Sequence, residues 1–208
     1  MRIVIADDHT IVRRGMQLIV AKRAGWSIAA EAASSDELFA ALRGASFDVV
    51  VLDLSLRGRS GLDILGQIRR ELPALPVLIL SSAPEEQYAL QFIRAGARGY
   101  LSKDASAEEI LEAIERVASG RLWLSPAVGD RLAAGIMNPA DRAPHELLSP
   151  REFEVFRFIA GGRTMTEIAG AMNISIKTAS TYRTRILDKT GFRSNADIIA
   201  YAIRSNLV

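Results

Sequence analysis

The chain contains no cysteine and only two histidines among its 208 residues. The absence of cysteine excludes disulfide bonds, zinc–thiolate sites and thiol catalysis, and two histidines are too few for a histidine-rich metal centre. No apolar run reaches the roughly 18 residues that a membrane span needs. Asp7 and Asp8 interrupt the first apolar run, which is unlike a secretory signal. We therefore expect a cytoplasmic protein with no membrane partner.

The length suits two small domains, and a hydrophobic content of 49% is enough to form their cores. The charge is unevenly distributed between the two halves. Residues 1–124 carry 15 Lys and Arg against 16 Asp and Glu, whereas residues 146–208 carry 9 against 6. A basic excess in the C-terminal part is compatible with a nucleic-acid contact there, although an excess of this size is common in proteins.

The first 120 or so residues alternate short apolar runs with helical patterns. Continuous apolar, β-branched runs predict buried strands, and they cover residues 2–6, 26–32, 48–53, 76–81 and 98–102. Helical patterns follow at about 9–23, 35–43, 61–71, 85–95 and 106–118. Five such units with short connections predict an α/β doubly wound, five-stranded parallel sheet. The ligands of such a sheet bind at the carboxyl ends of the strands.

The pattern changes after Gly120. Residues 126–136 can form a short helix, and residues 137–147 carry two prolines without periodicity, which predicts an exposed linker. From Leu148 onward the sequence predicts a small all-α domain of four helices, at about 150–160, 164–171, 176–189 and 194–205. We place the domain limits at 1–122 and 146–208, with a linker at 123–145.

Polar side chains stand at or near the carboxyl ends of the predicted strands: Asp7, Asp8, Asp53, Ser81, Tyr100 and Lys103. Carboxylates are the protein ligands that Mg²⁺ prefers. A carboxylate can also be the nucleophile that forms an acyl phosphate, and a lysine or hydroxyl can bind phosphoryl oxygens. Each residue alone has an ordinary structural explanation, such as a solvated loop charge or a half-buried ring. Their convergence on one sheet edge favours a site for a divalent metal and a phosphoryl group.

Four motifs in this part of the chain, IADDH, VVLDLSLRGRSGLDIL, VLILSS and GARGYLSKD, occur in a familiar order. With them the segment resembles the receiver domain of bacterial two-component response regulators. The resemblance implies that Asp53 accepts a phosphoryl group from a sensor histidine kinase and that Mg²⁺ is required. It implies Asp8 as a direct metal ligand, Asp7 as a ligand mainly through water, and the backbone carbonyl of Ser55 as a further ligand.

The resemblance also implies a switch. Ser81 is the expected switch hydroxyl, Tyr100 the switch aromatic and Lys103 the phosphate-binding lysine. Phosphorylated Asp53 would draw Ser81 toward its oxygens, and Tyr100 would turn into the space left behind. We interpret His9, which follows the two acids, as part of the surface at a helix start and not as a ligand.

The C-terminal part contains LSPREFEVFRFIAGG, EIAGAMNIS, KTASTYRTRILDKTG and AYAIRSNL. It resembles the LuxR-type helix-turn-helix domain of the NarL/FixJ group, which implies double-stranded promoter DNA as a partner and the third helix as the recognition helix. The implied base contacts are Ser180, Thr181 and Thr184. The implied phosphate contacts are Thr166, Lys177, Arg183, Arg185 and Lys189. Without the resemblance, an ordinary amphipathic helix with a solvated face would be the better interpretation.

The last predicted helix carries the apolar residues Ile198, Ile199, Ala202 and Ile203. In the family this helix pairs two DNA-binding domains, so we expect a homodimer on phosphorylation or on DNA. Such pairing would place two half-sites about one helical turn apart. Simple core packing is the alternative explanation for these four residues.

We therefore predict a phosphorylation-dependent, DNA-binding transcriptional regulator and not an enzyme. A phosphatase with an aspartyl nucleophile would usually carry a second acid two residues after the nucleophile, and this chain has Ser55 there. The other alternative is a constitutive DNA-binding regulator with an ungated receiver. A missing acid or lysine would favour it, and Asp7, Asp8, Asp53 and Lys103 are all present.

Overall fold

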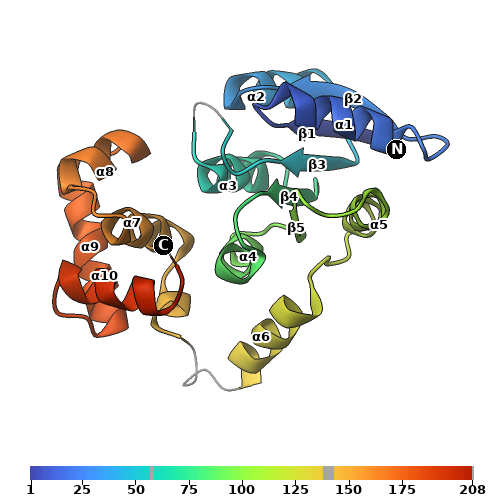
Figure 1. The fold of residues 1–208 in the computed structure, drawn as a ribbon. Helices are drawn as coiled ribbons and strands as arrows, with labels where there is room; N and C mark the ends of the chain where they lie inside the picture. Colours follow the sequence, from blue (N-terminus) through green and yellow to red (C-terminus); the bar gives the residue numbers. More distant parts are fainter. Residues whose placement is uncertain (57–58, 138–142, 208) are drawn as a thin grey trace. The chain divides into compact units, whose positions relative to one another are not determined.

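The computed structural model describes residues 1–56, 59–137 and 143–207 (Figure 1). The chain forms two compact units, Met1–Gly129 and Asp130–Val208, which we call the N-terminal unit and the C-terminal unit. None of the helices in the described residues is long and apolar enough to cross a membrane.

The N-terminal unit is built on a sheet of five parallel strands in the order β2-β1-β3-β4-β5. The strands are β1 (Arg2–Ala6), β2 (Ser27–Ala32), β3 (Val49–Leu52), β4 (Val77–Ser81) and β5 (Gly99–Ser102). Five helices alternate with them: α1 (Thr10–Val20), α2 (Ser35–Gly44), α3 (Gly61–Glu71), α4 (Glu85–Arg94) and α5 (Ala107–Ala118). Helices α1 and α5 cover one face and α2, α3 and α4 the other (Figure 1). The predicted doubly wound fold is confirmed.

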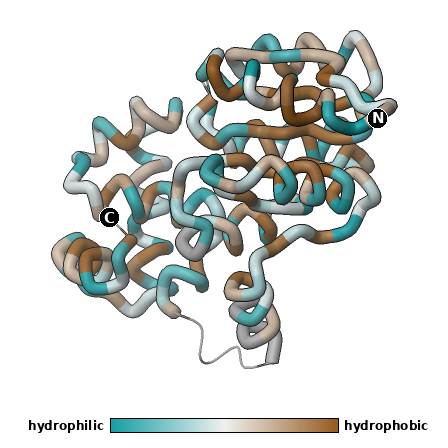
Figure 2. The backbone as a smooth tube through the Cα atoms, turned by 45° about the vertical axis from the view of Figure 1, so that its right-hand side comes forward, coloured by the Kyte–Doolittle hydropathy of each residue, from teal (hydrophilic) through white to brown (hydrophobic). Residues whose placement is uncertain are grey.

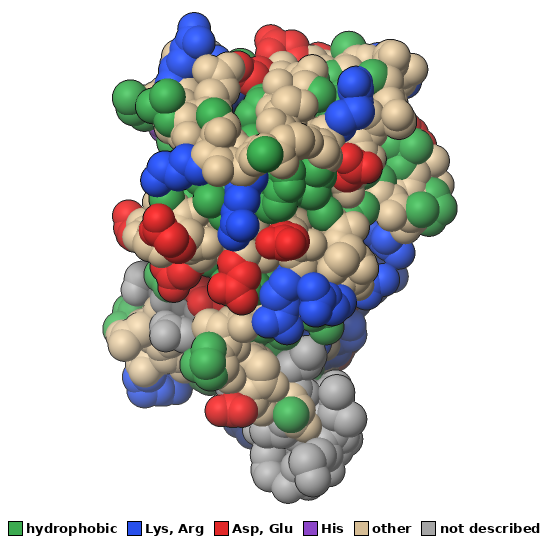
Figure 3. Space-filling view, turned by 90° about the vertical axis from the view of Figure 1, so that its right-hand side faces the viewer, with side chains coloured by type: hydrophobic (Ala, Val, Ile, Leu, Met, Phe, Trp, Pro, Cys, Tyr) green, Lys and Arg blue, Asp and Glu red, His purple; other side chains and the backbone are tan. Residues whose placement is uncertain are grey.

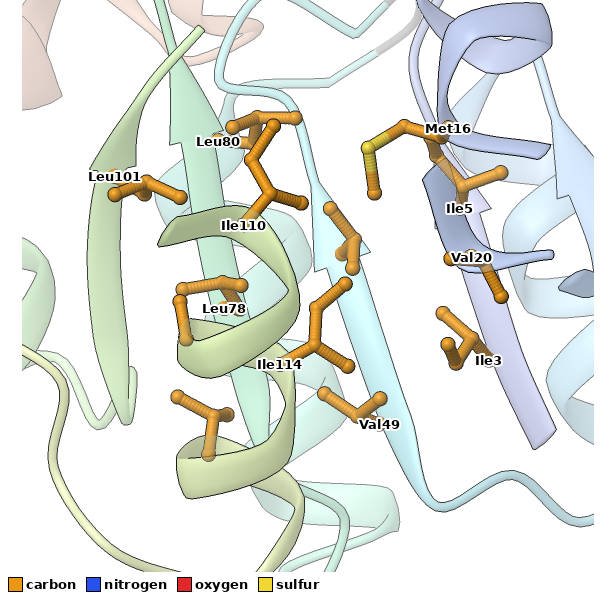
Figure 4. Close-up of a cluster of buried hydrophobic side chains, with 13 residues drawn as sticks. Ile3, Ile5, Met16, Val20, Val49, Leu78, Leu80, Leu101, Ile110 and Ile114 are labelled. Atoms are coloured by element: carbon orange, nitrogen blue, oxygen red, sulfur yellow. The ribbon is translucent and has the colours of Figure 1, made fainter. Parts of the chain in front are cut away.

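The apolar strands form the core because helices cover both faces of the sheet. Figure 2 shows hydrophobic residues running through the strands. Figure 4 shows one half of the core, where Met16 and Val20 of α1 and Ile110 and Ile114 of α5 meet the sheet. Each fully buried aliphatic side chain of this kind contributes roughly 1.5–3 kcal/mol, so this packing holds the strand ends in fixed positions.

The segment that follows α5 returns to the outer edge of β5. The Trp123 N–H donates to the Arg98 carbonyl at 2.9 Å, and the Tyr100 N–H donates to the Trp123 carbonyl at 3.4 Å. Gly99 is the residue between them, and a Cβ there would lie 2.8 Å from a methyl group of Leu78. The glycine thus allows the chain to approach the strand closely and to cover its edge.

The C-terminal unit is entirely helical among its described residues. It contains the end of α6 (Pro126–Met137), the 3₁₀ helix η2 (Pro144–Leu147), α7 (Pro150–Ala160), α8 (Met165–Met172), α9 (Ile176–Thr190) and α10 (Asn195–Arg204). The helices from α7 to α10 begin at hydroxyl N-caps, which satisfy backbone N–H groups that have no partner inside the helix, namely Ser149, Thr164, Ser175 and Ser194. The four predicted helices are therefore present, each within a few residues of its expected ends.

The expectation of an exposed linker at 137–147 is wrong at its C-terminal end. Residues 138–142 lie outside the described part of the chain, but His145 and Glu146 in η2 are buried, at 6% and 9% exposure. His145 Nδ1 lies 2.7 Å from the hydroxyl oxygen of Tyr201 in α10, and its ring packs against Phe153. A hydrogen bond and aromatic packing therefore hold this segment on the helical unit.

Candidate functional sites

Two buried aspartates lie side by side at the carboxyl end of the sheet. Asp7 follows β1 and is 1% exposed, and Asp53 follows β3 and is 2% exposed. The Asp53 N–H donates to the Ala6 carbonyl at 2.8 Å, which extends the pairing of β1 with β3. The chain leaves β1 for α1 on one face of the sheet and leaves β3 for α3 on the other face. A point between neighbouring strands where the direction reverses in this way is where open α/β sheets bind their ligands.

Lys103, just past β5, reaches both aspartates. Its Nζ lies 2.7 Å from Asp7 Oδ2 and 3.1 Å from Asp53 Oδ2. Burial raises the pKa of the Asp53 carboxyl, and the positive charge of Lys103 offsets this only in part. Burial lowers the pKa of Lys103, but the two carboxylates outweigh it and raise the pKa overall. Lys103 is therefore an ammonium ion directed at the predicted phosphoacceptor.

The same group of side chains offers a ligand set for a cation. Asp7, Asp8, His9 and Asp53 each provide one atom, and these atoms all lie within 4.8 Å of one another. The set is dominated by carboxylate oxygens, which fits a hard cation such as Mg²⁺. The side chain of His9 is 60% exposed, as expected, but its Nδ1 lies 2.8 Å from Asp8 Oδ1, a proximity that the sequence did not indicate. The ligand role of the Ser55 carbonyl stays a prediction.

Ser81 and Tyr100 both lie inside the N-terminal unit, Ser81 at the carboxyl end of β4 and Tyr100 in β5. Ser81, at the end of β4, is 3% exposed, and its Oγ accepts a hydrogen bond from the Ala83 N–H at 3.1 Å. Tyr100 is 0% exposed, and its hydroxyl donates to the Ala83 carbonyl at 2.8 Å. Burial raises the pKa of this hydroxyl, so it stays protonated. The ring thus occupies the inward position that we expected to follow phosphorylation.

Most of the predicted DNA contacts lie exposed on the helix-turn-helix, on α8 or α9: Thr166, Lys177, Ser180, Thr181, Thr184 and Arg185. The hydroxyls of Thr181 and Thr184 donate to the carbonyls one turn earlier, at 2.9 and 3.2 Å, which leaves their oxygens able to accept. The charges that bear on a DNA contact are those of these exposed helix residues. Figure 3 looks instead onto the N-terminal unit, where acidic and basic side chains are interspersed.

Two of the predicted phosphate contacts are engaged inside the C-terminal unit. The Arg183 Nε donates to Asn195 Oδ1 of α10 at 2.6 Å, and the Lys189 Nζ donates to Glu152 Oε2 of α7 at 2.6 Å. Glu152 is buried, at 3% exposure, so Lys189 compensates a buried charge. Both side chains hold α9 against its neighbouring helices, and this geometry gives them a structural role.

The four residues predicted to form a dimer contact fall into two groups. Ile198 and Ala202 are 0% exposed and belong to the core of the C-terminal unit, so their assignment to a dimer surface is corrected. Ile203 is 60% exposed and Ile199 is half-buried. Core packing and an exposed edge therefore coexist on α10, and only Ile199 and Ile203 stay candidates for a contact between two copies.

Comparison with known proteins covers both units. The family described as "Response regulator receiver domain" matches residues 3–115, and "Bacterial regulatory proteins, luxR family" matches residues 146–202. The response regulator GacA of Pseudomonas viridiflava is 30% identical over 209 residues, covering 100% of this chain and 98% of GacA. The oxygen regulatory protein NreC of Staphylococcus aureus (strain JH9) is 32% identical over 215 residues, covering 100% of this chain and 99% of NreC.

A solved structure is similar over nearly the whole chain. RcsB from Salmonella enterica serovar Typhimurium, bound to a promoter in the presence of the phosphomimetic BeF₃⁻, has a TM-score of 0.73 and 26% identity. The match covers 97% of each of the two chains. The likeness therefore extends over both units and is not limited to one of them.

Proposed function

We propose that Asp53 is the phosphoacceptor of this chain, which belongs to the bacterial response regulators that join a receiver domain to a LuxR-type DNA-binding domain. Membership in this family makes the chain a phosphorylation-dependent regulator of transcription. One observation carries the proposal. Asp53 is a buried carboxylate at a strand end, with the ammonium of Lys103 3.1 Å away and a second acid, Asp7, bound to the same ammonium.

In the proposed reaction a carboxylate oxygen of Asp53 attacks the phosphorus of a phosphohistidine on a sensor histidine kinase. An oxygen–phosphorus bond forms and the nitrogen–phosphorus bond breaks. The imidazole leaves with the bonding electron pair and takes up a proton from water. Lys103 can then pair with the charge of the new acyl phosphate, because it already lies within 3.1 Å of Asp53 Oδ2.

A Mg²⁺ ion bound at the site would supply charge neutralisation for the transferred phosphoryl oxygens. We assign its direct protein ligands to Asp8, Asp53 and the backbone carbonyl of Ser55, with Asp7 bound mainly through water. The clustering of the Asp7, Asp8 and Asp53 oxygens within 4.8 Å supports this assignment.

The contacts around Tyr100 suggest how a change at Asp53 reaches the linker. Ser81 lies at the same carboxyl end of the sheet as Asp53 and accepts a bond from Ala83, whose carbonyl binds the Tyr100 hydroxyl. The backbone of Tyr100 in turn binds Trp123 in the segment leading to α6. The Ser125 N–H in the same segment donates to Glu85 Oε1 of α4 at 3.1 Å. A shift of α4 or β5 would thus act directly on the chain that leads to the C-terminal unit.

The proposed output is the binding of α9 in the major groove of promoter DNA. Ser180, Thr181 and Thr184 are the proposed base contacts, with Thr166, Lys177 and Arg185 on phosphates. A homodimer formed on phosphorylation or on DNA through the exposed side of α10, including Ile203, would bind two half-sites about one helical turn apart.

The test is DNA-protection mapping of the full chain at one fixed salt concentration, before and after treatment with acetyl phosphate and Mg²⁺. Asp53→Asn removes the nucleophile and keeps the shape of the side chain. Asp36→Asn, an exposed carboxylate at the start of α2, is the matched control. Treatment should tighten the binding of the wild type and of Asp36→Asn to a two-fold symmetric protected region. It should leave the binding of Asp53→Asn unchanged.

Two results would contradict the proposal. If radiolabelled acetyl phosphate labelled Asp53→Asn as strongly as the wild type, the phosphoacceptor would be another residue. Equal DNA binding by treated and untreated wild type would identify a constitutive DNA-binding regulator, in which the receiver does not gate the helix-turn-helix.

A further inference from the structure

Arg13 in α1 bends back to the loop that carries the two metal-site acids. Its Nη1 donates to the Asp7 carbonyl at 2.7 Å, and its Nε lies 3.1 Å from Glu31 Oε2 of β2. The Arg13 side chain is only 14% exposed. Gln17, one turn further along α1, binds the other oxygen of Glu31. The guanidinium is therefore held in place by β2 and α1 and is not a free surface charge.

These contacts hold the backbone of Asp7 on both sides. Its N–H donates to the Ala32 carbonyl of β2 at 3.0 Å, and its carbonyl accepts from Arg13. The peptide plane between Asp7 and Asp8 therefore has a fixed orientation. The Cα atoms of Asp7 and Asp8, from which the two carboxylate side chains branch, both belong to this plane and are held with it.

We propose that Arg13 is a positioning residue for the divalent-cation site: it fixes the Asp7–Asp8 peptide and thereby preorganises the two carboxylates. The inference rests on the proposed function, because it takes these carboxylates to bind a divalent cation. Glu31 acts one step further away, since it holds the guanidinium that holds the peptide. Outer partners of this kind typically change metal affinity by 10–100-fold when they are removed.

The direction of the effect separates positioning from simple electrostatics. Arg13 is a positive charge beside a group of carboxylates, so Coulomb repulsion alone predicts that its removal tightens the binding of Mg²⁺. Loss of a positioned peptide predicts weaker binding. The two explanations therefore differ in sign and not merely in size.

The experiment is calorimetric titration of the full chain with MgCl₂ at constant ionic strength. Arg13→Met keeps much of the apolar stem but removes the charge and the donors, and should weaken Mg²⁺ binding about tenfold. Arg13→Lys, which keeps the charge and one donor, should recover part of the loss. Arg14→Met, at an exposed neighbour on the same helix, is the matched control and should bind as the wild type does.

Glu31→Gln tests the same idea without touching the bond to Asp7, and should weaken binding in the same direction by a smaller factor. It also decides the question if Arg13→Met does not fold. Wild-type affinity in Glu31→Gln, or equal or tighter binding by a folded Arg13→Met, would overturn the inference. A wild type that binds no Mg²⁺ would instead overturn the metal site of the proposed function.

Discussion

The two units use carboxylates in opposite ways. In the N-terminal unit Asp7 and Asp53 are buried beside Lys103, and burial raises the pKa of Asp53. In the C-terminal unit Glu152, Glu167 and Asp197 close capping boxes at the starts of α7, α8 and α10. Hydrogen bonds from these helix starts lower the pKa values of Glu167 and Asp197. The first arrangement buries charge at the proposed phosphoacceptor, and the second uses charge to cap helices.

The largest expected effect is at Asp53. Asp53→Asn should abolish phosphoryl transfer from acetyl phosphate, because the nucleophilic oxygen is gone. The same change should raise the free energy of unfolding of the N-terminal unit by roughly 1 kcal/mol. The reason is that a raised folded-state pKa makes the ionised carboxylate unfavourable at neutral pH.

Tryptophan fluorescence during urea unfolding measures this stability selectively, because Trp26 and Trp123 both lie in the N-terminal unit. Asp36→Asn is again the control and should leave the unfolding midpoint unchanged. A clear loss of stability in Asp53→Asn would show that the ion pair with Lys103 outweighs the cost of burial. The carboxylate of Asp53 would then stabilise its unit, as the capping carboxylates do, and the contrast between the units would not hold.

The second effect concerns Glu152 in the C-terminal unit. Burial raises the pKa of this carboxyl, but bonds from Lys189 and Ser149 outweigh it and leave the pKa lowered. Glu152→Ala should therefore lower the free energy of unfolding of this unit by about 2 kcal/mol, because it removes a helix cap and a buried charged hydrogen bond together.

Far-UV circular dichroism, compared with the tryptophan signal, isolates this loss. Glu154→Ala on the same helix is the matched control, because Glu154 pairs with Arg151 of the preceding turn. Such a pair near the surface contributes at most about 0.5 kcal/mol. Equal effects of the two variants would mean that the buried carboxylate has no special role.

Much of the fold could be predicted from the sequence, because the strongest signals are local. The run VVVL has no polar residue on either face of the strand, and VLILS has none before Ser81 at its end; only a sheet covered on both sides accommodates such strands. The strand-end acids and Lys103 could be predicted for the same reason. Once the strands are parallel, the residues that follow them must meet at one edge.

Sequence analysis missed two kinds of contact. Some join residues far apart in the chain, and others involve apolar residues whose pattern fits either a core or an interface. Lys189 meets Glu152 across 37 residues, and nothing near Lys189 distinguishes this ion pair from a phosphate contact. Ile198 and Ile203 share an apolar pattern that fits a core or an interface equally well, and only the packing of α7 against α10 decides between them. The carbonyl of Asp7 leaves no signal at all in the sequence, so the role of Arg13 could not be found there.

The third effect tests whether Lys189 stabilises the fold or binds DNA. Lys189→Met should lower the free energy of unfolding of the C-terminal unit by about 1 kcal/mol, because it leaves the buried Glu152 without its ammonium partner. It should leave the salt dependence of DNA binding nearly unchanged. Arg185→Met, at an exposed position of α9, should leave the free energy of unfolding nearly unchanged. It should reduce the slope of log affinity against log salt concentration by about 1.

Salt titrations of promoter binding measure the two slopes under identical conditions. A reduced slope for Lys189→Met would show that this lysine leaves Glu152 to bind a phosphate, as the sequence had predicted. In that case the charges of the C-terminal unit would serve both folding and DNA binding, and the contrast in the use of charge between the two units would be weaker.

The smallest expected effect is at two capping carboxylates, one in each unit. It shows whether the use of a carboxylate depends on the unit or only on its local environment. The N-terminal unit also contains a capping box, formed by Ser106 and Glu109 at the start of α5. A hydrogen bond from the Ser106 backbone lowers the pKa of Glu109, as a bond from Thr164 lowers that of Glu167. Glu109→Gln and Glu167→Gln should therefore destabilise their own units to a similar extent, and each by less than Glu152→Ala does.

The pH dependence gives this prediction its sign. A carboxyl with a lowered folded-state pKa contributes its full stability above its ordinary value of 4.5 and loses it as the pH falls through the folded-state pKa. The difference between each variant and the wild type should thus be present at pH 7 and should shrink below pH 4.5. Asp53 should show the opposite sign: its raised pKa makes the ionised form unfavourable, so the wild type should be less stable than Asp53→Asn at neutral pH and should gain stability relative to it as the pH falls. If Glu109 followed Asp53 instead of Glu167, the position of a carboxylate in the chain, and not its burial, would determine how the protein uses it.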